Sequence, residues 1–377
     1  MERKKYAVLG MCMFLLAGCT PDGPSRSESP AGPPLVTEEN ISVSVEESAV
    51  QENACEPETD EYRLRSVFLG EGAYSLQDAA VSNEGLIYYC TGRTDEETFG
   101  NAAELYQLFP DYAEEGSSQA AVCMTLLSDT LASVTAFDLL PDGGICALVC
   151  GDPFERPPEE WDTYYESPEN QWALLLYDRS GVLTGTADLT AFWDVPESLF
   201  FSGITADAQG RIYLSVLYGD VWQIWVLDES GNLQEQIPAE MFSGISRMST
   251  GPDGALLIFG QNEDYCSLLC ELDVQSGSLR EIRTFPEGEA LVFCPGGEAS
   301  AACCYADETG VYYEQPDTER VQVLLWEDTG LSGADVYWME QLDEKRFAVI
   351  YTDEAGASVA GLLENIDKDK SESEFFE

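Results

Sequence analysis

The stretch from Ser202 to Ile237, "SGITADAQGRIYLSVLYGDVWQIWVLDESGNLQEQI", decides the fold. It divides into four short apolar segments separated by the turn sequences Asp-Ala-Gln-Gly, Gly-Asp and Glu-Ser-Gly-Asn. The stretch Ser246–Phe285, "SRMSTGPDGALLIFGQNEDYCSLLCELDVQSGSLREIRTF", follows the same plan, and Gly210 and Gly254 hold the same turn position. Such a turn needs a residue that tolerates positive φ, which explains the glycine. The chain therefore contains a repeat of short strands.

Weaker copies of this unit begin at Leu76, Val134, Ala290 and Asp335, which makes six units in all. Two insertions, around Asp95–Glu104 and Asp152–Gln171, explain the longer early spacings. Four short strands every 40–50 residues, roughly, is typical of a β-propeller blade. We therefore predict an all-β chain with six four-stranded blades. Seven blades, or an open sandwich or barrel with coincidental spacing, remain the alternatives.

The last unit provides evidence for a closed ring. It supplies strands near Asp335–Asp343, Arg346–Asp353 and Ala357–Asn365, then turns polar without a fourth strand. The segment "YRLRSVFL", which begins at Tyr62, precedes the first unit as a spare strand. If this strand completes the last blade, no sheet edge stays exposed. We assign residues 61–366 to the propeller and 367–377 to a polar tail.

The N-terminus reads as a processing signal. A basic segment, Glu2–Lys5, precedes an apolar run from Tyr6 to Gly18, which is shorter than the roughly 20 residues that span a bilayer. The residues Leu16-Ala17-Gly18-Cys19 resemble the bacterial lipobox. This resemblance implies a signal peptide over 1–18 and acylation of Cys19 with palmitate-type chains. An ordinary secretory peptide or a buried helix is the alternative.

Two acyl chains are enough for stable anchoring, so Cys19 would hold the protein on the extracytoplasmic face of the cell membrane. Residues 19–60, which follow, are rich in Pro, Ser and Glu and lack aromatic residues. Such a segment buries too little apolar surface to offset its ordering entropy. We predict a disordered acidic tether between the lipid and the propeller.

The charge balance excludes several functions. The chain has 18 Lys and Arg against 70 Asp and Glu, a formal net charge of -52. Nucleic acid is therefore a poor partner, because binding it requires basic residues that neutralise phosphates. The sequence contains no histidine, which excludes Ser-His-Asp and Cys-His catalysis and the usual zinc sites. We predict no catalytic residue, no metal site and no cofactor.

Cysteine is abundant, and in an exported protein this would suggest disulfides. Cys146 and Cys150 fall on one strand about 13 Å apart, beyond the roughly 7 Å reach of a disulfide. Most of the others occupy apolar strand positions, where a small hydrophobe fits: Cys90, Cys123, Cys270 and Cys294. We predict buried thiols, while a cross-strand bridge between blades stays open.

The second insertion, "DPFERPPEEWDTYYESPENQW", places aromatic residues among acids and prolines. Aromatic planes beside carboxylates suit sugars or cationic ligands, and loops commonly carry function. The candidate ligand-binding residues are Trp161, Tyr164, Tyr165 and Trp172. The alternative is a loop whose aromatic residues pack onto the second blade. The acidic stretches "RTDEET" and "DYAEEG" lack the spacing of calcium loops.

The lipobox, acidic tether and glycine-turn blades together resemble surface lipoproteins of anaerobic Gram-positive bacteria. In some of these a propeller precedes a solute-binding module of an ABC transporter, but none follows the sixth unit here, so a role in uptake would belong to a partner. The resemblance implies a non-catalytic propeller that binds a protein, peptide or glycan, or a structural scaffold. A carbohydrate-active enzyme with carboxylates in the channel is the alternative.

Overall fold

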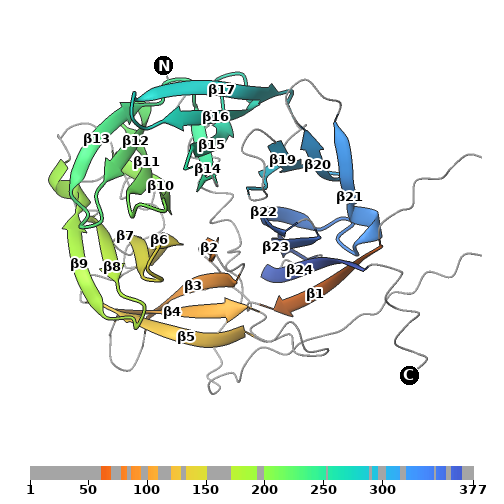
Figure 1. The fold of residues 1–377 in the computed structure, drawn as a ribbon, viewed down its shortest axis with the longest axis horizontal. Helices are drawn as coiled ribbons and strands as arrows, with labels where there is room; N and C mark the ends of the chain where they lie inside the picture. The colour runs from red at the N-terminus through yellow and green to blue at the C-terminus, as the bar shows by residue number, and fades with distance from the viewer. Residues whose placement is uncertain are drawn as a thin grey trace, which may run out of the picture.

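The structure is a computed structural model. It describes residues 61–68, 78–82, 86–94, 101–108, 120–128, 133–150, 171–192, 199–251, 254–287, 291–295, 303–314, 320–343, 345–353 and 358–366. The described strands form six antiparallel four-stranded sheets arranged in a ring (Figure 1). The prediction of a six-bladed propeller is confirmed.

The first three blades use strands in chain order from the centre outward. Blade 1 consists of β2 (Asp78–Val81), β3 (Ile87–Thr94), β4 (Asn101–Leu108) and β5 (Ala120–Leu127). Blade 2 consists of β6 (Ser133–Leu139), β7 (Ile145–Cys150), β8 (Trp172–Tyr177) and β9 (Leu183–Asp188). The 3-10 helix η3 (Leu189–Phe192) follows, and blade 3 consists of β10 (Leu199–Ala206), β11 (Ile212–Tyr218), β12 (Val221–Leu227) and β13 (Leu233–Pro238).

Blades 4 and 5 repeat this plan, and blade 6 departs from it. Blade 4 consists of β14 (Gly244–Thr250), β15 (Leu256–Gln261), β16 (Ser267–Asp273) and β17 (Ser278–Phe285). Blade 5 consists of β18 (Val292–Phe293), β19 (Cys303–Ala306), β20 (Gly310–Glu314) and β21 (Val321–Leu325), followed by the 3-10 helix η4 (Trp326–Asp328). Blade 6 consists of β22 (Asp335–Asp343), β23 (Arg346–Thr352), β24 (Ser358–Ile366) and β1 (Glu61–Phe68).

The ring closes through β1, as the spare N-terminal strand predicts. β1 pairs antiparallel with β24 in an unbroken register from Glu61↔Ile366 to Phe68↔Val359. It is the outermost strand of blade 6, next to the last strand of the chain (Figure 1). The first and last strands therefore hold each other, and the sixth sheet is complete only when both are present.

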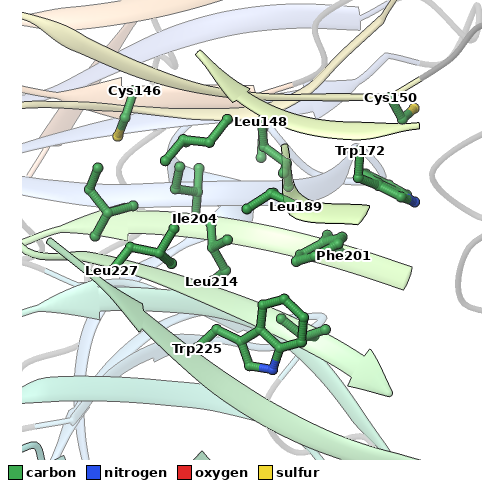
Figure 2. Packing of buried hydrophobic residues seen from close by; sticks show 14 of the residues in the cluster. Cys146, Leu148, Cys150, Trp172, Leu189, Phe201, Ile204, Leu214, Trp225 and Leu227 are labelled. Atoms are coloured by element: carbon green, nitrogen blue, oxygen red, sulfur yellow. The ribbon is translucent and has the colours of Figure 1, made fainter. Parts of the chain in front are cut away.

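The core lies between neighbouring blades. Between blades 2 and 3, Trp172, Phe201, Leu214 and Trp225 pack in one cluster, which Figure 2 shows from close by. Phe201 and Trp225 meet edge to face, with ring centroids 5.4 Å apart. The nearly continuous apolar strands such as β7, whose six residues are all buried, follow from this burial on both faces.

Two sequence predictions need correction. The first insertion was expected to span Asp95–Glu104, but β4 already begins at Asn101 and pairs with β3. The prediction of a buried Cys123 is wrong, because this residue lies on the outermost strand β5 and its side chain is exposed. Cys90, Cys270 and Cys294 are buried thiols, as expected, and so are Cys146 and Cys150 on β7.

Strand direction defines two faces of the ring. The entry face is the face at which the innermost strand of each blade begins. The links between blades and the turns between the second and third strands of each blade lie on this face. The opposite face, the exit face, carries the turns between first and second and between third and fourth strands. Because β24 ends and β1 begins on the exit face, the propeller connects to the preceding segment on that side.

Among the described residues, no helix is long and apolar enough to cross a membrane.

Candidate functional site

Large exposed apolar side chains gather on the entry face. Of the ten such residues in the described part of the chain, three belong to the exit face: Val182, Leu183 and Val321. The other seven follow the entry face around the ring: Leu127, Phe192, Val221, Met241, Tyr265, Leu291 and Tyr337. Exposed apolar patches commonly mark binding surfaces. The entry face is therefore the side on which a ligand would find most apolar contact.

Three of these residues, Val221, Met241 and Tyr265, come from adjoining loops of blades 3 and 4, and we call them the blade 3–4 patch. Val221 opens β12, Met241 lies in the link from β13 to β14, and Tyr265 lies in the turn from β15 to β16. Their exposed fractions are 36%, 36% and 57%. The Sδ atom of Met241 lies 3.1 Å from the Sγ atom of Cys270, so the link packs onto blade 4.

Hydrogen bonds through Ser243 hold these loops together. The indole N–H of Trp222, the residue after Val221, donates to the carbonyl of Ser243 at 2.9 Å. The hydroxyl of Ser243 donates to the carbonyl of Asn262 at 2.6 Å, and its N–H donates to the carbonyl of Gln261 at 2.7 Å. The loops that carry the patch are thus fixed relative to one another.

Tyr265 has a strained backbone. Its φ is 61°, the one positive value at a non-glycine residue in the described part of the chain. The carbonyl of Asn262 accepts from the N–H of Tyr265, and the side-chain oxygen of Asn262 accepts from the N–H groups of Asp264 and Cys266. In the described part of the chain the same five-residue backbone turn recurs five times, with glycine in place of tyrosine: Gly143, Gly181, Gly210, Gly231 and Gly254. The chain therefore keeps an exposed aromatic ring where glycine would relieve strain.

A carboxylate precedes each member of the patch. Asp220 precedes Val221, Glu240 precedes Met241, and Asp264 precedes Tyr265, and all three acidic residues are exposed. The loops 219–221, 239–243 and 262–266 contain no lysine or arginine. The patch therefore combines apolar contact area with negative charge, which suits a ligand that is both apolar and cationic.

The innermost strands around the centre of the ring carry a second set of candidate residues. The innermost strands β6, β10, β14 and β22 each contain a bulge, and the bulged residues are Thr135, Ser202, Ser246 and Tyr337. Thr135 and Ser246 donate to carbonyls of the second strand in their own blades. Bulges re-aim the side chains beside them. The residues that follow these four are Ala136, Gly203, Arg247 and Trp338.

Arg247, on the innermost strand of blade 4, contacts blades 5 and 6 as well. Its guanidinium lies over the ring of Trp338, 4.7 Å from the centroid, and donates to Glu340 at 2.7 Å. It also donates to the carbonyls of Phe293, at 3.4 Å, and Met339. These contacts extend from β14 past β18 to β22. Since its donors are engaged by the protein, Arg247 holds blades 4, 5 and 6 together.

The carboxylate of Asp138, on β6, is likewise engaged. It accepts from the N–H of Ala206 at 2.8 Å and from the hydroxyl of Thr205 at 2.9 Å, which links blade 2 to blade 3. Burial raises the pKa of Asp138 above its usual value, and these hydrogen bonds oppose the rise. Asp138 and Glu340 therefore each serve an inter-blade contact. No cluster of three or more potential metal ligands occurs among the described residues.

The candidate binding residues from the sequence fall into two groups. Trp161, Tyr164 and Tyr165 lie outside the described residues, as does Cys19. Trp172 is 1% exposed and its ring packs against that of Phe201, with centroids 5.2 Å apart (Figure 2). Its ring belongs to the core between blades 2 and 3, so the structure does not present it to a ligand. β7 ends and β8 begins on the entry face, where the insertion connects.

Comparisons with known proteins give matches among solved structures. No family model and no curated protein matches the sequence. Among solved structures, a catalytically inactive virginiamycin B lyase from Staphylococcus aureus with quinupristin has a TM-score of 0.47 and 11% identity, over 81% of this chain and 100% of that chain. An oligogalacturonate lyase in complex with manganese has a TM-score of 0.48 and 13% identity, over 79% of this chain and 78% of that chain.

The Dos1 propeller has a TM-score of 0.43 and 10% identity, over 78% of this chain and 69% of that chain. Because these TM-scores are below 0.5 and the identities are low, neither the likenesses nor the activities of these proteins carry an argument about this chain.

Sequence reasoning missed Tyr265 and Arg247. A signal for Tyr265 exists, because "NEDYC" fits the turn pattern of "DAQGR" with tyrosine at the glycine position. For Arg247 the signal is weaker: it is a basic residue in the short inner strand "GISRMST".

Proposed function

We propose that this protein is a lipid-anchored extracytoplasmic propeller that binds a polypeptide without catalysis, through the blade 3–4 patch. The observation that carries the proposal is the strained, exposed Tyr265 beside Met241 and Val221. Strained backbone persists where the surrounding structure fixes it and tends to cluster at functional sites.

The chemistry of the patch favours a polypeptide as the ligand. Two of its three members, Val221 and Met241, are not aromatic, whereas a sugar site would use several aromatic planes, and methionine adapts to varied apolar partners. Asp220, Glu240 and Asp264 add negative charge around them. The partner would therefore be a segment with basic and apolar residues, and its binding would weaken as salt rises.

The strand order supports an orientation in which the blade 3–4 patch would face away from the membrane. β1 begins at Glu61 on the exit face, so a tether over residues 19–60 would attach on that side. The blade 3–4 patch lies on the opposite face, which would point away from the membrane. Trp161, Tyr164 and Tyr165 lie outside the described residues, in the insertion between β7 and β8, and they are tested separately below.

Two experiments test the proposal. Metabolic labelling with a fatty acid analogue tests the anchor: label is expected on the wild type and absent from Cys19→Ala, and equal label on both would refute it. A peptide and glycan array tests the ligand, using the wild type, a Met241→Ser/Tyr265→Ser variant and a Trp161→Ala variant.

Basic apolar peptides should be retained by the wild type and lost by Met241→Ser/Tyr265→Ser. Retention of glycans alone would contradict the polypeptide assignment. If Trp161→Ala abolished peptide binding and Met241→Ser/Tyr265→Ser did not, the binding site would lie in the insertion and the proposed site would be wrong.

A further inference from the structure

Cys294 and Cys304 lie opposite each other across the first two strands of blade 5. β18 pairs with β19 in the register Val292↔Ala306 and Phe293↔Tyr305, and the next step of this register places Cys294 opposite Cys304. The N–H of Cys294 donates to the carbonyl of Cys304 at 3.0 Å, which confirms the pairing. Cys294 directly follows β18 and Cys304 lies on β19, whereas Cys146 and Cys150 lie on the same strand.

The two side chains meet in the core. Cys294 is 1% exposed and Cys304 is 4% exposed, and both are free thiols in the structure. Both residues belong to one buried cluster, and burial together with the neighbouring Cys304 thiol raises the pKa of Cys294 well above its usual value. Cα atoms of directly opposite residues are about 4.5–5.5 Å apart. That range lies within the roughly 4.4–6.8 Å that a disulfide spans.

We propose that Cys294 and Cys304 are a disulfide-forming pair that joins β18 covalently to β19. In the reaction two S–H bonds break and one S–S bond forms. The two electrons and two protons pass to a small-molecule disulfide, which becomes two thiols. The exchange begins with a thiolate and needs access to the attacking sulfur. Because both sulfurs are buried in the closed ring, the bond forms while blade 5 is still open during folding.

The bond has a structural consequence at the centre of the ring. β18 has two residues, the shortest strand among those described, and Phe293 precedes Cys294 directly. The carbonyl of Phe293 is one of the acceptors of Arg247. A disulfide at Cys294 therefore fixes the strand that supplies this acceptor, and it strengthens the junction of blades 4, 5 and 6.

Thiol mapping after refolding tests the pair. The reduced, denatured full chain is refolded in a mixture of oxidised and reduced glutathione, denatured again, alkylated and cleaved after glutamate. Glu298 lies between the two cysteines, so a bridge would join two separate peptides. Cys303, which pairs with Glu314 in the register, is the matched control. The expected result is joined peptides in the wild type and in Cys303→Ser, and none in Cys304→Ser or Cys304→Val.

Full alkylation of Cys294 in the refolded wild type would overturn the proposal. Joined peptides that are still found in Cys304→Ser and Cys304→Val but are absent from Cys303→Ser would also overturn it, because the bridge would then involve Cys303. The wild-type mapping decides the question even where a variant fails to fold. A higher urea midpoint for the oxidised protein than for the same protein after reduction would support the consequence for the ring. This inference does not depend on the proposed function.

Discussion

Replacing Tyr265 with glycine should stabilise the protein while removing the ring from the blade 3–4 patch. A non-glycine residue in the left-handed region costs about 1–2 kcal/mol. Glycine also loses more chain entropy on folding than alanine does, which reduces this gain in stability by about 0.4–1 kcal/mol. The φ of 61° at Tyr265 therefore predicts that Tyr265→Gly is more stable than Tyr265→Ala by about 0.8 kcal/mol, the difference of the two central values.

The comparison with alanine isolates the backbone effect, because both substitutions delete the same aromatic ring. Tyr265 is 57% exposed, so the loss of the ring itself should change stability little. Urea unfolding of the wild type and both variants measures the difference, and peptide binding should fall alike in both variants. If alanine proves as stable as glycine, the turn is not strained and the reason for assigning Tyr265 a function disappears.

Three further perturbations test the ring and its turns. Arg247→Met should lower the free energy of unfolding by about 3 kcal/mol, because it removes one donor to Glu340 and to two carbonyls. A double-mutant cycle with Glu340→Gln in urea should show strong coupling, and additive losses would contradict the contact. Gly361→Val should weaken the pairing of β1 with β24, since a Cβ atom at this position would lie 2.8 Å from side-chain atoms of Leu64 and Val349. Trypsin should then cut this variant at Arg63 or Arg65. Gly254→Ala, which strains a turn in blade 4, is the control and should leave β1 protected from trypsin. The N–H of Asn232 and other donors lower the pKa of Asp228, so the ionised carboxylate stabilises the fold at higher pH and this contribution is lost as pH falls through the lowered pKa. The stability difference between wild type and Asp228→Ala should therefore shrink between about pH 5 and about pH 3. A difference that stays constant over this range would refute the assignment.

The repeat and the closing strand were predictable because both depend on local signals. Glycines at positions such as Gly210 and Gly254 mark turns that recur along the chain, and the missing fourth strand of the last unit matches the spare strand at Tyr62. Contacts across the ring were not predictable. Arg247 meets Glu340 because of the curvature of the whole ring, and no pattern of the intervening residues encodes that curvature.

Other features needed strand direction and register. Trp172 looked like part of an aromatic insertion, but it opens β8, and its position there turns the ring into the core. Cys294 and Cys304 read as isolated apolar positions until the register of β18 and β19 places them opposite each other. The blade 3–4 patch likewise gathers residues from three loops that only the entry face brings together.

One binding measurement tests the proposed function most directly. The probe is a synthetic peptide of lysine and leucine, compared with the same peptide carrying glutamate in place of lysine. The wild type is compared with Met241→Ser/Tyr265→Ser on the entry face and with Val182→Ser/Val321→Ser, which removes two apolar side chains, 59% and 56% exposed, from the exit face. The proposal predicts that the lysine peptide binds, that the glutamate peptide does not, and that the entry-face variant alone loses affinity by about tenfold or more, equivalent to about 1.4 kcal/mol. Equal affinity of the entry-face variant and the wild type for the lysine peptide would contradict it.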